Sequence, residues 1–226
     1  MSHPRIILGS QSVNRQHLIA LAGIEAEIMP SDFDEYAVKP ADFPDHDSYV
    51  STIATGKLFT LADQLETTDN TYIVGGDLVV YLDDVPYHKP TSLSQAREYM
   101  QLFSGATHTE VCATAFWSPN TGVQTEVSTV LVTVPELTDK EIEDYLEIAT
   151  PLTKAGGFSI QAVQKIVRRR EPPATSTVEG SISALLGISL PAVEKFFTQA
   201  GLPVPRSTAK IESELAADIG VEVANT

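Results

Sequence analysis

An aspartate inside an apolar strand gives the first chemical signal in this sequence. Asp77 stands in "YIVGGDLVV", where the apolar run predicts a buried strand. A buried carboxylate is costly unless it is paired or bound to a metal, which favours a functional role such as general base for a water molecule. The preceding Gly75 and Gly76 allow a bend or the close approach of a ligand. The alternative is an aspartate that caps its own hairpin turn.

A second group of acids lies in "SDFDEY", where Asp32, Asp34 and Glu35 are close together in the chain. Hard oxygen ligands at such spacing suit Mg²⁺ or Mn²⁺. The spacing of an EF-hand loop is absent. The alternative interpretation is a solvated acidic loop without a ligand.

The segment "GSQSVNR", residues 9–15, lies between a predicted strand and a predicted helix. Backbone N–H groups at such a helix start attract anions, and the hydroxyls of Ser10 and Ser12 add donors. Arg15 falls in the first turn of the helix, where its guanidinium can bind a phosphate through two hydrogen bonds. The alternative is that Ser10 or Ser12 only caps the helix.

Cations are few in this chain, which has 15 Lys and Arg against 30 Asp and Glu. Lys57 lies in a long predicted helix, Lys89 in "YHKP" and Lys154 in "PLTKAGGFSIQ". Lysines beside turns and apolar segments indicate an anion site weakly, and surface solvation is the alternative. The last segment also holds two glycines and Gln161 but no acid, an uncommon combination in so acidic a protein.

Strands and helices must position these residues. Short apolar runs predict strands at residues 5–10 and 25–31, and helical spacing predicts helices at 13–23, 48–66, 92–105 and 138–149. Hairpins are predicted to turn at residues 83–84 and 120–122. Strand–helix alternation together with long hairpins predicts an α/β fold with a mixed sheet. Residues 206–226 are expected to form an acidic tail, either loose or a helix that depends on dimerisation.

The composition limits the possible functions. Apolar residues make up 42% of 226 residues, which is ordinary for a globular protein with a large core. The formal net charge of −15 opposes sequence-independent binding of nucleic acid. We expect no membrane span and no signal peptide, and a single cysteine, Cys112, fits a reducing cytoplasm. Cys112 lies in an apolar run and is expected to be a core thiol.

Read in order, these segments resemble the Maf family of nucleoside triphosphate pyrophosphatases. The family pattern LASxSPRR stands here as "LGSQSVNR", its DE pair as Asp34-Glu35, AxxKA as "ATGKL", GADTVV as "GGDLVV", GKP as "HKP", SGxTHxV as "SGATHTEV" and PxDKAGxYxIQ as "PLTKAGGFSIQ". The resemblance covers roughly residues 5–200 and depends on the ordered set of motifs.

The resemblance implies a Maf/inosine-triphosphatase-like α/β fold, an elongated mixed sheet with helices and two lobes around a central cleft. We therefore expect one domain of two lobes over residues 1–205, before the acidic tail. The implied activity is hydrolysis of the α–β phosphate bond of non-canonical or pyrimidine nucleoside triphosphates, giving a monophosphate and pyrophosphate. The family also implies a divalent cation, Mg²⁺ or Mn²⁺, a cytoplasmic location and a homodimer.

The resemblance also implies roles for individual residues. Asp77, Lys57 and Lys89 match positions with catalytic roles, and Glu35 and Asp77 match the positions that organise the metal. The matching positions for substrate binding are Ser10, Ser12, Arg15, Lys154 and Gln161.

The residues that depart from the family include Val13, Asn14, Gly56, Leu78 and His88. Val13 and Asn14 stand for Pro-Arg, so one of two phosphate-binding arginines is missing. This leaves a second hypothesis open, a catalytically impaired nucleotide-binding or regulatory protein on the same fold. A third is an unrelated metal-dependent phosphatase. The three differ in product, because they predict pyrophosphate, nothing, or orthophosphate.

Overall fold

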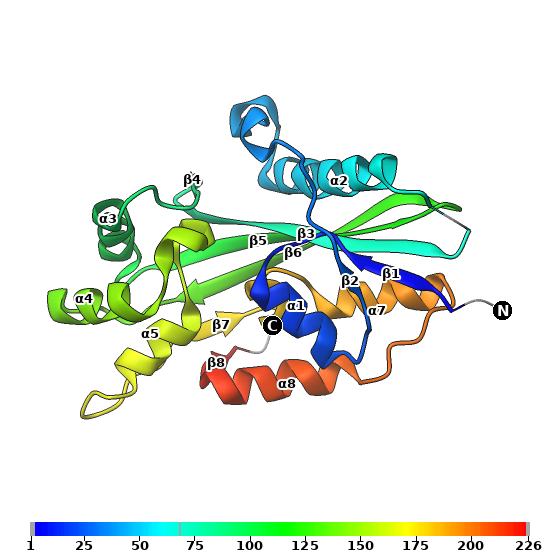
Figure 1. Ribbon diagram of the computed structural model, residues 1–226. Coiled ribbons are helices and arrows are strands. Elements are labelled where there is room, and N and C mark those ends of the chain that lie inside the picture. The colour runs from blue at the N-terminus through cyan, green and yellow to red at the C-terminus, as the bar shows by residue number, and fades with distance from the viewer. Residues whose placement is uncertain (1–2, 68, 225–226) are drawn as a thin grey trace. The chain divides into compact units, whose positions relative to one another are not determined.

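One eight-stranded mixed sheet organises the protein, as Figure 1 shows for the computed structural model, which describes residues 3–67 and 69–224. The strand order is β2-β1-β3-β5-β6-β7-β8, and β4 pairs with β3 beside this path. β1 is parallel to β2 and β3, whereas β3–β4 and β6–β7 are antiparallel. The predicted mixed sheet is therefore confirmed. The strands are β1 Arg5–Leu8, β2 Glu27–Ile28, β3 Thr71–Leu82, β4 Val85–Tyr87, β5 Thr107–Ser118, β6 Gly122–Thr133, β7 Thr177–Glu179 and β8 Glu222–Val223.

The predicted helices at 13–23, 48–66, 92–105 and 138–149 are present, with small changes at their ends. The second begins two residues early, because the Asp45 carboxylate accepts a 2.7 Å hydrogen bond from the N–H of Ser48 and caps it. The helices of the described residues are α1 Val13–Leu21, α2 His46–Gln64, α3 Leu93–Phe103, α4 Asp139–Ile148, α5 Ile160–Val167, α6 Ile182–Leu185, α7 Leu190–Gln199 and α8 Thr208–Ile219. None of these helices is long and apolar enough to cross a membrane.

The described residues divide into two compact units, and β3, β5 and β6 contribute residues to both. The first unit draws on the ranges 1–78, 111–128 and 181–213. The second draws on the ranges 79–110, 129–180 and 214–226.

In the first unit, helices cover the sheet through apolar side chains. Leu58 of α2 is fully buried and lies against the backbone of Gly75 in β3. On α7, Phe196 and Phe197 pack on Phe116 of β5, with ring centroids 5.8 and 5.7 Å apart. The apolar side of α7 thus belongs to the core. Cys112 is buried there as expected.

In the second unit, the predicted hairpin is closed by Asp83 and Asp84, whose φ angles of 49° and 62° match the left-handed turn that joins β3 to β4. Aromatic packing fills the centre of this unit. Phe103 of α3 packs on Tyr87 of β4 at 5.3 Å and on Phe158 at 6.0 Å. This packing places the segment around Phe158 on the body of the unit.

The segment after residue 205 contains α8 and β8. Ile211 and Leu215 of α8 are buried, so this helix packs within its own chain. Its Glu212 carboxylate accepts hydrogen bonds from Ile182 N at 2.6 Å, from Ser183 N at 3.2 Å and from the hydroxyls of both Ser181 and Ser183. Glu212 thus satisfies the free N–H groups at the start of α6.

Replacing Glu212 by glutamine is expected to destabilise the protein. An amide oxygen accepts more weakly than a carboxylate and its NH₂ group faces the donors of α6, so we expect a loss of about 1–3 kcal/mol in the free energy of unfolding. Urea denaturation followed by circular dichroism measures this loss. Asp218→Asn, at an exposed position of the same helix, is the matched control and is expected to leave the stability unchanged. Equal stabilities of both variants would contradict the role of Glu212.

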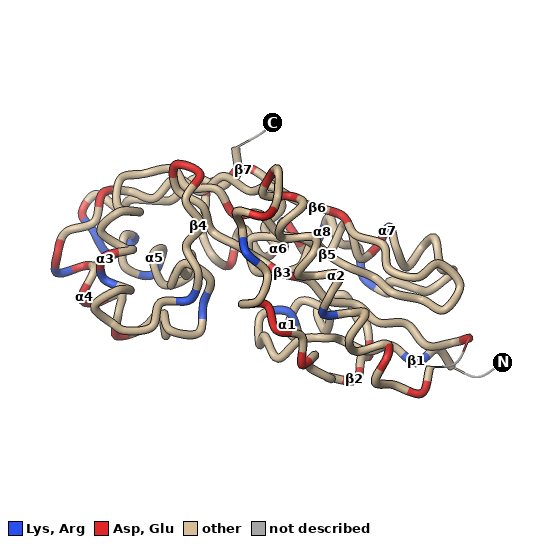
Figure 2. Tube along the Cα trace, turned by 90° about the horizontal axis from the view of Figure 1, so that it is seen from above, with Lys and Arg blue, Asp and Glu red and all other residues tan. Residues whose placement is uncertain are grey.

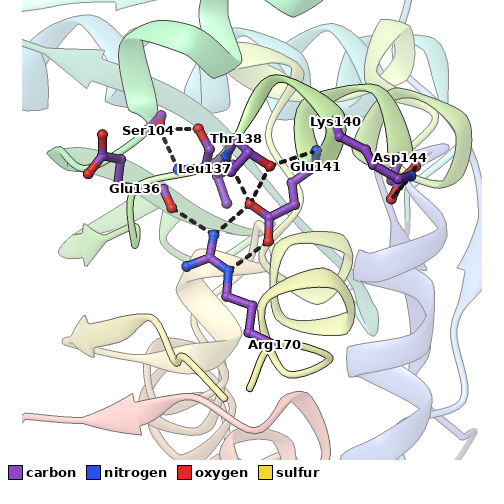
Figure 3. Close-up of polar contacts among 8 residues, drawn as sticks. All are labelled: Ser104, Glu136, Leu137, Thr138, Lys140, Glu141, Asp144 and Arg170. Carbon is purple, nitrogen blue, oxygen red and sulfur yellow. Dashed lines mark hydrogen bonds and ion pairs between the residues drawn. The ribbon is translucent and has the colours of Figure 1, made fainter. Parts of the chain in front are cut away.

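Acidic residues are spread over both units and outnumber Lys and Arg, as Figure 2 shows. Three consecutive arginines, residues 168–170, follow α5. Arg170 is paired: its Nε lies 2.6 Å and its Nη2 2.8 Å from the carboxylate of Glu141, and Nη2 also donates to the carbonyl of Glu136 (Figure 3). Glu141 closes a capping box with Thr138 at the start of α4.

Stability is expected to fall in acid because of this pair. The Arg170 guanidinium lowers the pKa of Glu141 from 4.5 to about 2. A lowered folded-state pKa stabilises the protein above pH 4.5, and that stabilisation is lost as the pH falls towards 2. After allowance for solvent screening, Arg170→Met is expected to remove about 1–2 kcal/mol at pH 7 and much less near pH 2. Arg97→Met, which breaks the more exposed pair with Glu143, should cost less than half of that at pH 7.

Candidate active site

Lys57 is at the centre of a polar cluster in the first unit that also contains Glu35 and Asp77. It lies one helical turn from the buried Ile53 and Leu61 of α2. Its Nζ lies 2.5 Å from Glu35 Oε2 and 2.6 Å from Asp77 Oδ1. The three side chains are only 15%, 27% and 13% exposed. Residues from three separate motifs thus meet at one ammonium group, and the carboxylate of Asp77 has the partner that its burial requires.

Two glycines allow Asp77 to reach this place. A side chain on Gly75 would meet Leu58, and one on Gly76 would meet the carbonyl oxygen of Ala113. β3 runs through both without interruption, so the sequence's double glycine serves close packing inside a regular strand.

The acidic loop separates into three different roles. Glu35 reaches Lys57, as described. Asp34 accepts a 3.1 Å hydrogen bond from Tyr36 N and caps the short 3₁₀ helix η1, Glu35–Ala37, while Asp32 is exposed. One acid of the loop therefore pairs with Lys57, one caps the loop itself, and one faces solvent, while the predicted metal binding stays a prediction.

Tyr49 also belongs to this cluster, although no motif of the sequence includes it. Burial raises the pKa of its hydroxyl, and the charges of Asp77 and Glu35 raise it further. The hydroxyl therefore stays protonated and can donate a hydrogen bond near the two carboxylates. Tyr49 precedes Lys57 by about two helical turns, so its place on the same face of α2 is the signal that could have identified it.

The segment between β1 and α1 forms a second polar group in the same unit. Ser12 caps α1 by accepting from Arg15 N at 3.5 Å, so the capping interpretation holds for this serine. The guanidinium of Arg15 donates from Nη1 to Ser10 Oγ at 3.2 Å and from Nε to the carbonyl of Gly187 at 2.6 Å. These two bonds hold the guanidinium beside the start of α1, where the helix also favours an anion.

The two groups come from neighbouring strands, Ser10 from the residues just after β1 and Asp77 from the interior of β3. β1 and β3 are parallel neighbours, and Gly9 N donates to Val74 O at 2.8 Å just beyond the end of β1. Ser10 follows Gly9, and Asp77 follows Val74 by three residues. Ligands of α/β proteins bind beyond the carboxyl ends of such strands.

The second unit holds the remaining three candidates, Lys89, Lys154 and Gln161. Burial lowers the pKa of Lys154, which precedes the 3₁₀ helix η4, Ala155–Gly157. The exposed Lys89 is followed by Pro90, and a side chain on Gly157 would meet that proline ring. The two lysines thus come from segments that pack on each other within this unit.

Gln161 lies in the first turn of α5, and its Oε1 accepts a 3.2 Å hydrogen bond from the Ser159 hydroxyl. Tyr145 fixes the loop before this helix by donating to Gly157 O at 2.6 Å. Gly156 and Gly157 have φ angles of 59° and 63°, and a side chain on Gly156 would meet Val80. Both glycines are therefore needed for the turn and for its packing on the protein.

The donor set fits a cation that is only partly coordinated by protein. Over residues 3–67 and 69–224, no group of three or more His, Cys, Asp or Glu side chains is placed to hold a metal. Glu35 and Asp77 supply two hard carboxylates at Lys57. Mg²⁺ is commonly held by one or two carboxylates, water and the phosphates of a substrate, so these two residues suit Mg²⁺ or Mn²⁺.

Comparison with known proteins agrees with the motif order. A family model described as Maf-like protein matches residues 5–200. The dTTP/UTP pyrophosphatase of Akkermansia muciniphila is 30% identical over 196 residues, which cover 85% of this chain and 94% of the relative. That of Anaeromyxobacter dehalogenans is 30% identical over 89% of this chain and 97% of the relative, and that of Bacillus cytotoxicus is 34% identical over 70% and 78%. On these matches, this chain belongs to the Maf family.

Proposed function

We propose that this protein is a metal-dependent pyrophosphatase that hydrolyses the α–β phosphate bond of pyrimidine nucleoside triphosphates, dTTP and UTP foremost. The observation that carries this proposal is the contact of the Lys57 ammonium with both Glu35 and Asp77. Family membership supports a hydrolase of nucleotide anhydrides, and the names of the relatives support the choice of bases.

Binding of a triphosphate requires local positive charge, because the chain carries a net charge of −15. Arg15 and the two serines beside it, Ser10 and Ser12, would hold phosphate oxygens at the start of α1. For Lys89 we propose the catalytic role, and for Lys154 and Gln161 the substrate-binding role, that the family resemblance implies. Burial disfavours the charged form of Lys154 and thereby lowers its pKa, so an anionic ligand would stabilise the ammonium.

The proposed chemistry needs a base and a set of positive charges. Asp77 accepts a proton from the attacking water as the water oxygen bonds to phosphorus. The bond between the attacked phosphorus and the α–β bridging oxygen breaks, and the bridging oxygen leaves with the other phosphate group. The products are a monophosphate and pyrophosphate. Lys57 stabilises the negative charge that develops on the phosphates.

Glu35 and Asp77 are the residues that would hold the divalent cation, Mg²⁺ or Mn²⁺. When bound, it supplies further neutralisation of phosphate charge and polarises water. Lys57 pairs with both carboxylates, so the cation would share at least one of them with it.

The test is a product assay on dTTP, UTP, CTP, ATP, GTP and modified triphosphates, with Mg²⁺ or Mn²⁺ and with EDTA. Pyrophosphate and monophosphate from the pyrimidine triphosphates, absent with EDTA, are the expected result. Nucleotide binding by calorimetry without turnover would instead favour the regulatory protein suggested by the missing arginine at Asn14. Release of orthophosphate would point to a phosphatase and would contradict the proposal.

We also propose that the protein acts in the cytoplasm as a homodimer. The single cysteine and the family resemblance support these proposals. Light scattering after size-exclusion chromatography tests the dimer, and a mass near the 24.4 kDa of one chain would contradict it.

A further inference from the structure

A glycine in the middle of α2 has no conformational explanation. Gly56 lies inside a regular helix of 19 residues, where glycine is less favourable than alanine because it loses more backbone entropy on folding. Its neighbour Lys57 is the centre of the candidate active site. The absence of a side chain at position 56 therefore needs another reason.

The reason is the ring of Phe33. A Cβ atom on Gly56 would collide with Cε2, Cζ and Cδ2 of this ring, which occupy the space beside the helix. Phe33 is half-buried, and the loop that carries it also carries Glu35 two residues later. One loop therefore contacts α2 twice, through Phe33 on Gly56 and through Glu35 on Lys57.

Local hydrogen bonds make this loop a compact unit. Phe33 N donates to Ser31 Oγ at 3.2 Å, Glu35 N donates to Phe33 O at 3.1 Å, and Tyr36 N donates to Asp34 Oδ1 at 3.1 Å. These bonds lie within residues 31–36 and fix the shape of the loop, whereas the Phe33 ring sets how close the loop lies to α2. A displacement of the ring would carry Glu35 away from Lys57.

We propose that Gly56 and Phe33 are positioning residues, which together set the distance between the Glu35 carboxylate and Lys57 and thereby the geometry of the cation and substrate site. This inference rests on the proposed function for its effect on turnover. Its structural part, the placement of residues 31–36 by the ring, can be measured without any activity.

Gly56→Ala is the test. Helix propensity alone predicts a variant whose melting temperature is unchanged or raised by about 1–4 °C. If the ring needs the space, kcat/KM for dTTP falls about 10-fold or more, Mn²⁺ binds more weakly in calorimetry, and the amides of residues 31–36 exchange hydrogen faster. Thr52→Ala, at an exposed position of the same helix, is the control for propensity and should leave all three unchanged.

A double-mutant comparison with Phe33 distinguishes the positioning role of Gly56 from a general effect of Gly56→Ala on the helix. In a Phe33→Ala background the ring is gone, so adding Gly56→Ala is expected to change kcat/KM less than twofold. Phe33→Leu, which keeps an apolar side chain, should retain more activity than Phe33→Ala. Unchanged kcat/KM and hydrogen exchange in Gly56→Ala, or an equal cost in both backgrounds, would overturn the proposal.

Failure of the proposed function gives a different result. A wild-type protein that releases no pyrophosphate would contradict the enzyme assignment. Hydrogen exchange at residues 31–36 and Mn²⁺ affinity would then still decide whether Gly56 and Phe33 place the loop.

Discussion

Asp77→Asn is expected to lower kcat for pyrophosphate release by about 10³-fold, with KM changed far less. Asparagine has nearly the same shape but cannot take a proton from water, and general-base catalysis typically contributes 10²–10⁴-fold. Its amide can also no longer balance the charge of Lys57, which keeps Glu35 as a partner at 2.5 Å. A coupled assay for pyrophosphate and a thermal melt measure the two effects, and we expect the melt to stay nearly unchanged.

Asp34→Asn is the matched control for Asp77. Asp34 lies in the loop of the first unit beside Glu35, and its side chain accepts from Tyr36 N, which an asparagine oxygen also can do. We expect its activity to stay within about threefold of the wild type. A kcat for Asp77→Asn within tenfold of the wild type would mean that another group takes the proton.

Replacing Lys57 by methionine is expected to lower kcat/KM by about 10²-fold, because the positive charge that would stabilise phosphate oxygens is lost. Metal binding should move in the opposite direction. Without the ammonium, Glu35 and Asp77 face each other uncompensated, so a divalent cation should bind to the free protein at least as tightly as before. Calorimetry with Mn²⁺ alone measures this affinity.

The combination of slower turnover and undiminished metal affinity is specific to Lys57. Lys39→Met is the control: Lys39 is exposed and donates to the carbonyl of Tyr36 at 2.8 Å, in the same unit. It should leave both quantities unchanged. Loss of Mn²⁺ binding in Lys57→Met would show that the lysine holds the carboxylates in place, and that its charge is not its main contribution.

Most of the fold follows from short-range signals in the sequence. Ser92 and Thr138 mark the starts of α3 and α4, and the acidic pair at 83–84 marks the β3–β4 turn, because caps and left-handed turns depend on a few neighbouring residues. The sequence patterns predict neither α5 nor β7, and they allow the residues of α8 to form either a loose tail or a helix. Ile211 is buried by contacts with the rest of the chain, and no local pattern identifies such partners.

In the candidate site, too, local sequence signals identify single residues but not the contacts between distant parts of the chain. Asp77 and Lys57 could be chosen from the sequence, the first by its apolar surroundings and the second by family resemblance. Their contact with Glu35 depends on three elements meeting in space. Phe33 could not be chosen, because an aromatic residue near an acid is common and only its packing on α2 gives it a role. Tyr49 could be chosen only by its place on the same face of α2 as Lys57.

The carboxylate of Glu212 has a consequence for interpreting natural variants. It lies beyond residue 200, where the family match stops, and a survey guided by that match would treat changes there as neutral. Yet Glu212 accepts a hydrogen bond from the first residue of α6. Gly187 follows the end of α6 by two residues, and its carbonyl accepts a hydrogen bond from Arg15. Inherited substitutions at residue 212 are therefore candidates for altered nucleotide affinity, even though 197 positions (212 − 15) separate them from the arginine in the chain.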